Sequence, residues 1–546
     1  MADVDRPVPR PRPHSSLPLV TRIALRSIAS VLGLAVLSTS AAAQTDTANT
    51  PTLVVFLTID QMRPDYLPRF EKQLTGGLKR LYDQGAVFLN GYQDHAITET
   101  APGHSATMSG RFPASTGIVT NAAGVEDPLA PMIGGGGPGA SPFRFRGSTL
   151  TDWIRLATPR SRAMSVSRKD RGAILPIGRQ PEEVYWYATD GRFTTSTYYH
   201  DTLPGWVQAF NAKKIPETYA GTAWTLLLPA KEYPELDSVD FENGGRGVVF
   251  PHPFPASPAD AARAFSAYPA MDSLTLQFAL NGVTAMGLGS GPVTDVLAVS
   301  LSTTDAVGHA FGPDSREIHD QILRLDRSLG IFFDSLFKLR DANRIVVALT
   351  ADHGVQPNPW AHARATKGVP VYVDLEPIIA TTAERLAAHG ADPKALRVDE
   401  SMVTVDRDLL SRAHVDADSL LRTFANDVKQ VPGIQRVDRV KDLTKRDTVT
   451  DYVARRWLHM LPPDLPVDLV ITLQPYAYWE GSIPATHGTP NDLDARVPVI
   501  FYGSMIKPGK RDDVVRVVDI APTLAKIVRV RPTERLDGRV LTQVLR

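Results

Sequence analysis

The sequence of 546 residues contains no cysteine. This absence excludes disulfide bonds, thiolate zinc sites, lipoprotein anchoring and cysteine nucleophiles, so any metal ion must be bound by histidine, aspartate or glutamate. The chain also lacks an excess of charge of either sign, because 59 Lys and Arg balance 59 Asp and Glu. No basic surface therefore indicates a nucleic-acid partner. Hydrophobic residues make up 43% and charged residues 22%, which is typical of a globular protein and excludes disordered, collagen-like and coiled-coil chains.

Long apolar runs are also missing, and the only apolar run of the targeting type is short. Two arginines precede residues 27–37, which are apolar, and three alanines follow at 41–43. A basic region, an apolar segment and a small-residue cleavage site are typical of a secretory signal peptide. A membrane anchor is disfavoured, because a span needs ~18–20 apolar residues. We expect residues 1–43 to be a signal peptide, and residues 44–546 to be periplasmic or secreted, with no membrane span.

Short runs of aliphatic and β-branched residues predict buried strands. They lie at 53–59, 296–301, 345–349, 469–472 and 497–502, the last interrupted by a proline. Continuous apolar runs indicate strands that are covered on both faces, as in parallel sheets. Between them, one apolar stripe predicts a helix that begins near residue 313: Ile318, Ile322, Leu325, Leu329, Phe332 and Leu336. The sequence predicts an α/β fold, a three-layer sandwich around a mostly parallel central sheet.

Two stretches lack this pattern and predict insertions that cap the sheet. Residues 122–290 contain a glycine-rich run at 134–139 and a proline-rich run at 251–255, which favour loops and short helices. Residues 368–466 are rich in charge and helical in character. We interpret the glycine-rich run as a surface loop rather than a phosphate-binding loop.

Acidic residues follow three of the predicted strands: Asp60, Asp305 and Asp352. Ligands of open α/β sheets bind at the carboxyl ends of the strands. Each aspartate alone would usually be a helix cap or a turn residue. However, His309 lies four residues after Asp305, His353 directly follows Asp352, and His487 offers a further imidazole. Carboxylates and imidazoles suit zinc, and several carboxylates in one site suit a two-metal centre.

These residues, together with Thr100-Ala-Pro-Gly-His104 and the segments 519–524 and 537–538, resemble the alkaline phosphatase superfamily in order and spacing. The resemblance extends from about residue 52 to 540. It implies two Zn²⁺ ions, with one ligand set for each ion. The first set is Asp60, Asp352, His353 and the Thr100 oxygen; the second is Asp305, His309 and His487.

The resemblance also implies that Thr100 is the nucleophile and forms a phosphothreonine. A free hydroxyl is almost wholly protonated at neutral pH, and coordination to zinc lowers its pKa. The structural alternative is that Thr100 only caps a helix that begins before Pro102. We assign His104 a structural role rather than a ligand role.

Residues around the nucleophile separate the branches of this superfamily. Sulfatases have a Cys or Ser in a C/S-x-P-x-R context, which Thr100-x-Pro-x-His104 does not match. Nucleotide pyrophosphatase/phosphodiesterases share the threonine, the ligands and an asparagine that Asn121 matches. Residues 167–174 resemble the Lys-x-Arg element of the phosphate-irrepressible periplasmic alkaline phosphatases, with Lys169 and Arg171 in its two basic positions. Without the resemblance, residues 169–171 would be interpreted as a solvated charged turn. We expect no role in the site for Arg168 and Asp170.

The charge of the substrate explains the importance of this pair. A phosphate monoester carries nearly two negative charges at neutral pH, whereas a diester carries one and needs room for a second substituent. Lys169 supplies a point charge, Arg171 a planar fork and Asn121 a hydrogen bond. The sequence therefore predicts an alkaline phosphatase acting on small-molecule phosphate monoesters. The alternative is a type I phosphodiesterase/nucleotide pyrophosphatase on the same metal centre.

Other functional classes fit the sequence less well. A non-catalytic metal- or phosphate-binding protein is disfavoured because every nucleophile and ligand position is filled. Phosphomutases have no evident use outside the cytoplasm, and phospholipid-headgroup transferases usually carry several membrane spans. We expect the protein to be a monomer.

Overall fold

The computed structural model describes residues 50–135, 137–399 and 401–546, so the expected signal peptide lies outside the described residues. A mixed central sheet has the strand order β17-β2-β16-β9-β1-β8-β3-β4-β5, with β18 beside β2. Its strands are β1 (Leu53–Ile59), β2 (Ala86–Tyr92), β3 (Ala163–Ser167), β4 (Glu183–Tyr187), β5 (Phe193–Thr194), β8 (Asp295–Leu301), β9 (Ile345–Thr350), β16 (Arg496–Gly503), β17 (Gly509–Arg511) and β18 (Val515–Arg516).

The centre of this sheet is parallel. Strand β1 lies between β8 and β9, and all seven of its residues are buried. Strands β3 and β4 continue the parallel order beyond β8. Strand β16 runs antiparallel between β9 and β2, with a register shift between Val497 and Val499, where Pro498 has no N–H to donate. The prediction of an α/β fold with a mostly parallel central sheet is confirmed.

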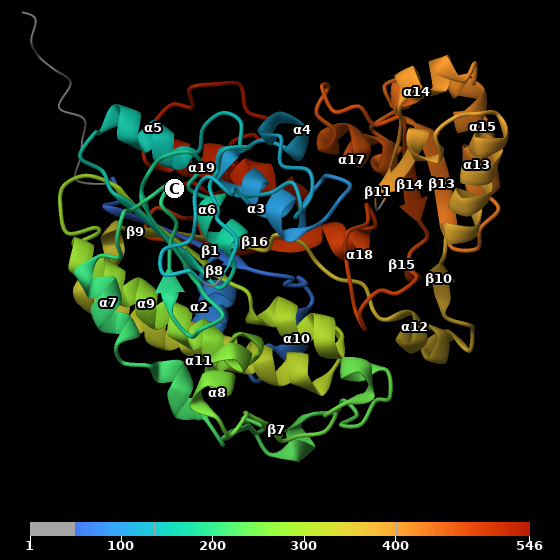
Figure 1. The fold of residues 1–546 in the computed structure, drawn as a ribbon. Helices are drawn as coiled ribbons and strands as arrows, with labels where there is room; N and C mark the ends of the chain where they lie inside the picture. The colour runs from blue at the N-terminus through green and yellow to red at the C-terminus, as the bar shows by residue number, and fades with distance from the viewer. Residues whose placement is uncertain (1–49, 136, 400) are drawn as a thin grey trace, which may run out of the picture. The chain divides into compact units, whose positions relative to one another are not determined.

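Helices cover both faces of the sheet and complete the three layers (Figure 1). On one face pack α2 (Gly77–Gln84), α9 (Ala270–Met286) and α11 (Arg316–Leu339); on the other pack α3 (Thr100–Ser109), α5 (Leu150–Ala157), α6 (Asp170–Ile174) and α19 (Ile520–Ile527). The six apolar residues of the predicted stripe all lie on α11 and are at most 1% exposed. The Ser315 side chain accepts a hydrogen bond from the Ile318 N–H and so caps α11.

Residues 122–290 contribute more to the sheet than the sequence predicts. They supply β3, β4 and β5 of the central sheet and the long helix α9. The run Ala163–Ser167 alternates apolar residues with serines that are fully buried, so its composition does not reveal a buried strand. Loops and short elements make up much of the remainder, including α7 (Gly205–Asn211), β6 (Ala223–Trp224), β7 (His252–Pro253) and α8 (Pro258–Ala264).

A second, four-stranded sheet lies within the later part of the chain. Its order is β11 (Leu396–Asp399), β12 (Met402–Val405), β14 (Leu469–Leu473) and β13 (Ile434–Arg439), and every pairing is antiparallel. The apolar core beside it includes side chains of α13 (Glu376–Ala388) and α15 (Ala417–Val428), and a separate cluster includes α17 (Tyr452–Met460). The run at 469–472 was predicted among the parallel strands, and this is wrong. A continuous apolar run indicates burial on both faces, not strand direction.

Short elements connect these parts. They are α1 (Tyr66–Phe70), α4 (Pro113–Thr116), α10 (Thr303–Phe311), α12 (Pro359–Thr366), β10 (Val371–Val373), α14 (Arg407–Arg412), α16 (Val440–Leu443), β15 (Ala477–Trp479) and α18 (Asp492–Ala495), together with single 3₁₀ turns. Within the described residues, no helix combines the length and the apolar character needed to cross a bilayer.

A buried acid in the segment over α10 makes stability depend on pH. Glu242 is 4% exposed, and its Oε2 has no hydrogen-bond partner. Burial, then the nearby carboxylates of Glu317 and Asp237, raise its pKa from 4.5 to about 9. The folded protein therefore retains a proton that the unfolded chain loses between these pH values, so stability falls as the pH rises from 4.5 to 9.

Glu242→Gln should remove this loss. We expect the free energy of unfolding of the variant, measured with urea, to match that of the parent near pH 4.5. At pH 9 it should exceed the parent's value by at least ~1 kcal/mol. The exposed Glu232, changed to Gln, is the control of equal charge and should follow the parent at both pH values. An equal loss of stability in Glu242→Gln at both pH values would contradict the assignment.

Candidate active site

Three neighbouring parallel strands bring three carboxylates to one edge of the sheet. Asp60 directly follows β1, Asp305 lies in the first turn of α10 after β8, and Asp352 follows β9. Because β9, β1 and β8 are adjacent and in register, their carboxyl ends meet at the same edge. All three side chains are buried.

Asp60, Asp352 and His353 form the first ligand group. Their ligand atoms lie within 4.8 Å of one another. Asp60 Oδ1 and His353 Nε2 are 3.4 Å apart, and neither has a hydrogen-bond partner among the described residues. Burial, then the neighbouring Asp305 and Asp352, raise the pKa of Asp60, while burial lowers that of His353 well below its ordinary value. Orphaned buried oxygens beside a neutral imidazole fit a divalent cation.

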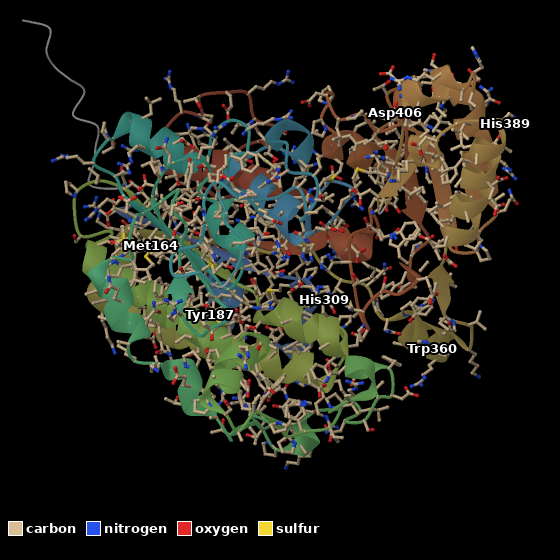
Figure 2. All side chains as sticks on the ribbon, viewed as in Figure 1. Met164, Tyr187, His309, Trp360, His389 and Asp406 are labelled. Atoms are coloured by element: carbon tan, nitrogen blue, oxygen red, sulfur yellow. The ribbon has the colours of Figure 1, made fainter. Side chains whose placement is uncertain are left out.

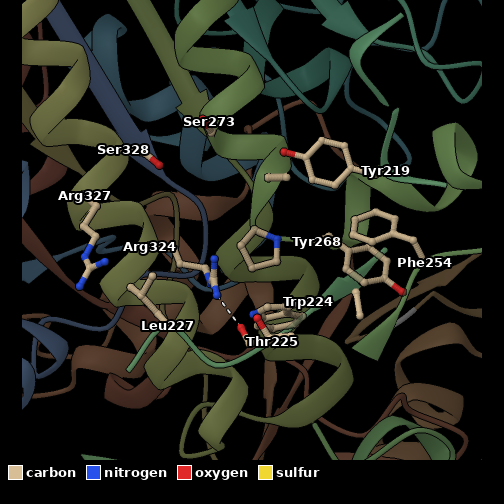
Figure 3. A pocket seen from close by; sticks show the side chains of 13 residues that line it. Tyr219, Trp224, Thr225, Leu227, Phe254, Tyr268, Ser273, Arg324, Arg327 and Ser328 are labelled. Carbon is tan, nitrogen blue, oxygen red and sulfur yellow. Dashed lines mark hydrogen bonds between the residues drawn. The ribbon is translucent and has the colours of Figure 1, made fainter. Parts of the chain in front are cut away.

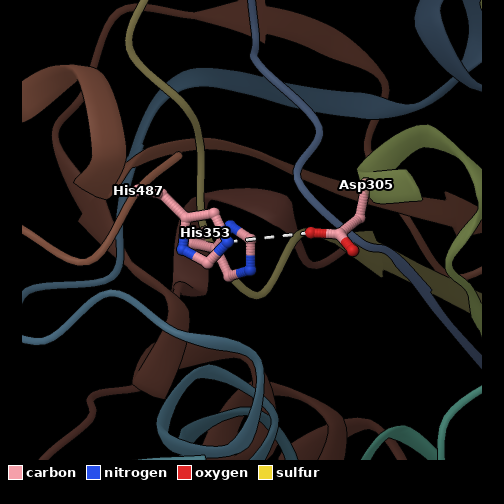
Figure 4. A group of neighbouring side chains, drawn as sticks. All are labelled: Asp305, His353 and His487. Carbon is pink, nitrogen blue, oxygen red and sulfur yellow. Dashed lines mark ion pairs between the residues drawn. The ribbon is translucent and has the colours of Figure 1, made fainter. Parts of the chain in front are cut away.

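Asp305, His309 and His487, the residues of the second predicted ligand group, lie close together. Asp305 Oδ1 lies 3.1 Å from His309 Nε2 and 3.7 Å from His487 Nε2, and the two imidazole nitrogens are 3.3 Å apart. The ligand atoms of Asp305 and His487 also lie within 4.8 Å of that of His353 (Figure 4). The two groups therefore meet at His353.

The same kind of hydrogen bond orients the three histidines of the two ligand groups. Each Nδ1 donates to a main-chain carbonyl: His309 to Ala485 at 2.7 Å, His353 to Gly354 at 2.9 Å and His487 to Thr98 at 2.7 Å. A carbonyl only accepts, so the proton is on Nδ1 and the Nε2 lone pair is available to a metal ion. Figure 2 shows His309, on α10, among the side chains of the molecule.

Thr100 lies beside these groups, in the helical layer that contains α3, α5, α6 and α19. It is the first residue of α3 and is buried, and Glu99 is the N-cap, so Thr100 does not cap the helix. Helix α3 approaches the Asp352 loop closely: a Cβ at Gly103 would lie 2.1 Å from the Asp352 carbonyl oxygen. Only glycine permits this approach of helix and loop.

Lys169 connects Thr100 with both ligand groups. Its Nζ lies 2.7 Å from Asp60 Oδ2, 2.7 Å from Asp305 Oδ2 and 3.1 Å from Thr100 Oγ1. Lys169 is the N-cap of α6, which packs against α3. Its cation therefore lies among the carboxylates and the Thr100 hydroxyl.

The other two residues predicted to bind the substrate are Asn121 and Arg171. Asn121 Oδ1 accepts from the Ala101 N–H at 2.9 Å, which leaves its amide N–H groups available beside the first turn of α3. Arg171 lies on α6, and its Nε has no hydrogen-bond partner among the described residues. Its guanidinium is 3.6 Å from Asp170, and the structure shows no hydrogen bond from it to another predicted site residue.

Two further polar residues contact the site. His104 is fully buried, with Nδ1 2.9 Å from the Thr100 carbonyl oxygen and Nε2 2.8 Å from Ser300 Oγ. Gln61 was missed by the sequence analysis. Its side-chain amide donates to Asp305 Oδ1 and its main-chain N–H to Asp352 Oδ1, both at 3.1 Å. The available signal was a polar residue directly after Asp60, which by itself does not reveal a contact 244 residues away.

A separate cavity of about 280 Å³ lies away from these residues, between residues 219–273 and helix α11 (Figure 3). Aromatic side chains line it on one side, and Arg324, whose guanidinium donates to the Thr225 carbonyl, lies on the other. None of its lining residues belongs to either ligand group.

Comparisons with known proteins identify the family to which the chain belongs. The model of the family described as type I phosphodiesterase/nucleotide pyrophosphatase matches residues 54–444. The chain is 33% identical to alkaline phosphatase PhoV of Synechococcus elongatus, over 91% of this chain and 93% of PhoV. It is 31% identical to alkaline phosphatase PafA of Elizabethkingia meningoseptica, over 94% and 98%. The crystal structure of wild-type PafA matches with a TM-score of 0.84 at 30% identity, over 91% of this chain and 99% of that one.

The chain belongs to the alkaline phosphatase superfamily and, within it, to the alkaline phosphatases of the PafA and PhoV type, which are related to the nucleotide pyrophosphatase/phosphodiesterases.

The two ligand groups predict a definite metal content. We expect two divalent ions per chain by elemental analysis, and Asp305→Asn should lose at least one of them because its carboxylate faces both His309 and His487. Asp295, equally buried but at the start of β8, is the matched control, and Asp295→Asn should retain both ions. An unchanged metal content in Asp305→Asn would contradict the assignment of this group.

Proposed function

We propose that this alkaline phosphatase is an exported enzyme that binds two zinc ions and hydrolyses small-molecule phosphate monoesters through a phosphothreonine at Thr100. The observation that carries the proposal is the position of Lys169 Nζ, which lies within 3.1 Å of the Thr100 hydroxyl and 2.7 Å of a carboxylate from each ligand group. A nucleophile, a cation and two groups of metal ligands thus share one edge of the sheet.

The residues divide into two metal sites in this proposal. Asp60, Asp352, His353 and the Thr100 oxygen hold one ion; Asp305, His309 and His487 hold the other. Bound zinc supplies Lewis-acid chemistry that lowers the pKa of a coordinated hydroxyl and stabilises charge on oxygen. The orphaned ligand atoms and the Nε2 lone pairs of three histidines, with carboxylates as the other ligands, support this ion type.

The chain's own groups then carry the two displacements. Thr100 Oγ1, without its proton, attacks phosphorus, so that a bond from Thr100 to phosphorus forms as the ester P–O bond breaks and the alcohol leaves with one proton. Water later attacks the phosphothreonine, which releases inorganic phosphate and restores the Thr100 hydroxyl. Lys169, Arg171 and an Asn121 amide N–H bind the phosphoryl oxygens, whose charge persists in the loose transition state.

A phosphodiesterase on the same centre is the second candidate, because the matching family model is described as a type I phosphodiesterase/nucleotide pyrophosphatase. The two cationic side chains favour the monoester. A dianionic group gains more from two positive charges than a monoanionic one, and the second substituent of a diester requires space.

Substrate preference tests the roles of the cations. We expect kcat/KM for an aryl phosphate monoester to far exceed that for the matching methyl aryl diester on zinc-loaded enzyme. Lys169→Ala or Arg171→Ala should lower the monoester value ~10–150-fold, since a hydrogen bond to a charged group is worth ~1.5–3 kcal/mol, and lower the diester value less.

The neighbouring Arg168 is the matched control. Its guanidinium donates to the Ser302 carbonyl, so Arg168→Gln should leave the preference unchanged. Equal losses on both substrates in the Lys169 and Arg171 variants would contradict the role of the pair, and a preference for the diester in the parent would favour the second candidate.

Export is tested on the full chain expressed in a Gram-negative host. We expect the protein in the periplasmic fraction with Gln44 as its first residue by N-terminal sequencing, because cleavage follows residues 41–43. Lengthening the apolar run or reversing the two preceding arginines to glutamate should block this processing. An unprocessed cytoplasmic chain would contradict the signal-peptide assignment.

A further inference from the structure

Gln61, directly after the metal ligand Asp60, has an unusual main-chain conformation. Its φ is +66°, in the left-handed region that side chains other than glycine adopt at a cost in free energy. The residue is nonetheless 1% exposed and tightly enclosed. Strained residues persist where surrounding contacts determine them, and such positions are frequent at functional sites.

The contacts of Gln61 reach one carboxylate in each ligand group. Its main-chain N–H donates to Asp352 Oδ1 at 3.1 Å, the same oxygen that accepts from the His353 N–H at 3.1 Å. Its side-chain Nε2 donates to Asp305 Oδ1 at 3.1 Å. Asp352 Oδ1 is thus held by two main-chain amides, while its Oδ2 lies 3.2 Å from His104 Nδ1.

A glycine on the facing helix makes room for this amide. A Cβ at Gly308, which precedes His309 on α10, would lie 1.9 Å from Gln61 Oε1. Glycine inside a helix is itself less favourable than alanine. Two locally unfavourable features, the positive φ of Gln61 and the glycine at position 308 of a helix, therefore allow Gln61 to bridge the two ligand groups through hydrogen bonds.

We propose that Gln61 is a positioning residue that fixes the two metal-binding groups relative to each other. The left-handed turn directs its N–H to Asp352, and the extended side chain orients the Asp305 carboxylate toward His309 and His487. Gln61 contacts ligands and not the reacting atoms, so it acts through them. The inference rests on the two-metal function proposed above.

Gln61→Gly is the most selective test. It removes the side-chain amide, keeps the main-chain N–H and relieves the strain of a positive φ. We expect one of the two zinc ions to bind 10–100-fold more weakly in competition with a chelator, because losses of this size follow from removing the partners of metal ligands. The thermal midpoint of the metal-free protein should not fall, and excess zinc should restore monoester kcat/KM in part.

Gly308→Ala supplies an independent test in a double-mutant cycle. The added methyl should displace the amide and weaken the same ion in the parent, but have little further effect when Gln61 is already glycine. Gly205→Ala is the control, since Gly205 begins helix α7 and a Cβ there meets open space. Additive effects of the two substitutions would contradict a shared bridge.

The outcomes separate this inference from the proposed function. If the parent binds fewer than two zinc ions, the proposed function fails. If the parent binds two and Gln61→Gly binds both with unchanged affinity, only the positioning role fails. A fall in the stability of the metal-free variant equal to that of the loaded variant would also overturn it, because Gln61 would then stabilise the fold and not the metal sites.

Discussion

The rest of the site depends on the meeting of three buried carboxylates at one edge of the sheet. Strands β9, β1 and β8 are parallel, adjacent and in register, so Asp352, Asp60 and Asp305 converge by topology alone. Burial, and then the charges of Asp305 and Asp352, raise the pKa of Asp60. Such a cluster is stable only where cations accompany it. Lys169 is one such cation, and the geometry of the ligand atoms fits two metal ions as the others.

The surrounding structure serves this convergence. Three main-chain carbonyls orient the histidines, so that each Nε2 lone pair faces the carboxylates. Gly103 lets helix α3 bring Thr100 against the Asp352 loop, and α6 brings Lys169 to the same point. Thr100, the proposed nucleophile, and Lys169 therefore come from the helical layer, while the three carboxylates lie just beyond the carboxyl ends of the sheet strands. The site at this edge therefore forms where the sheet contacts the helical layer, and the two layers are built from different segments of the chain.

The sequence predicted the parts of the fold that local patterns encode. The apolar stripe of α11 and the aspartates after β1, β8 and β9 follow from periodicity and from the ends of apolar runs. The direction of β14 did not follow, because an apolar run records burial and not pairing. Strands β3 and β4 were missed because buried serines and aromatic residues interrupt the aliphatic pattern. Gln61 was missed because its importance lies in a positive φ and in contacts far along the chain.

Anomalous diffraction at the zinc absorption edge, from crystals of the zinc-loaded enzyme, would locate each bound ion among its ligands. We expect two peaks, one within bonding distance of Asp60, Asp352, His353 and Thr100 and the other within bonding distance of Asp305, His309 and His487. A single peak, or a second ion held by His353 with Asp305 and His487 while His309 lies apart, would contradict this assignment.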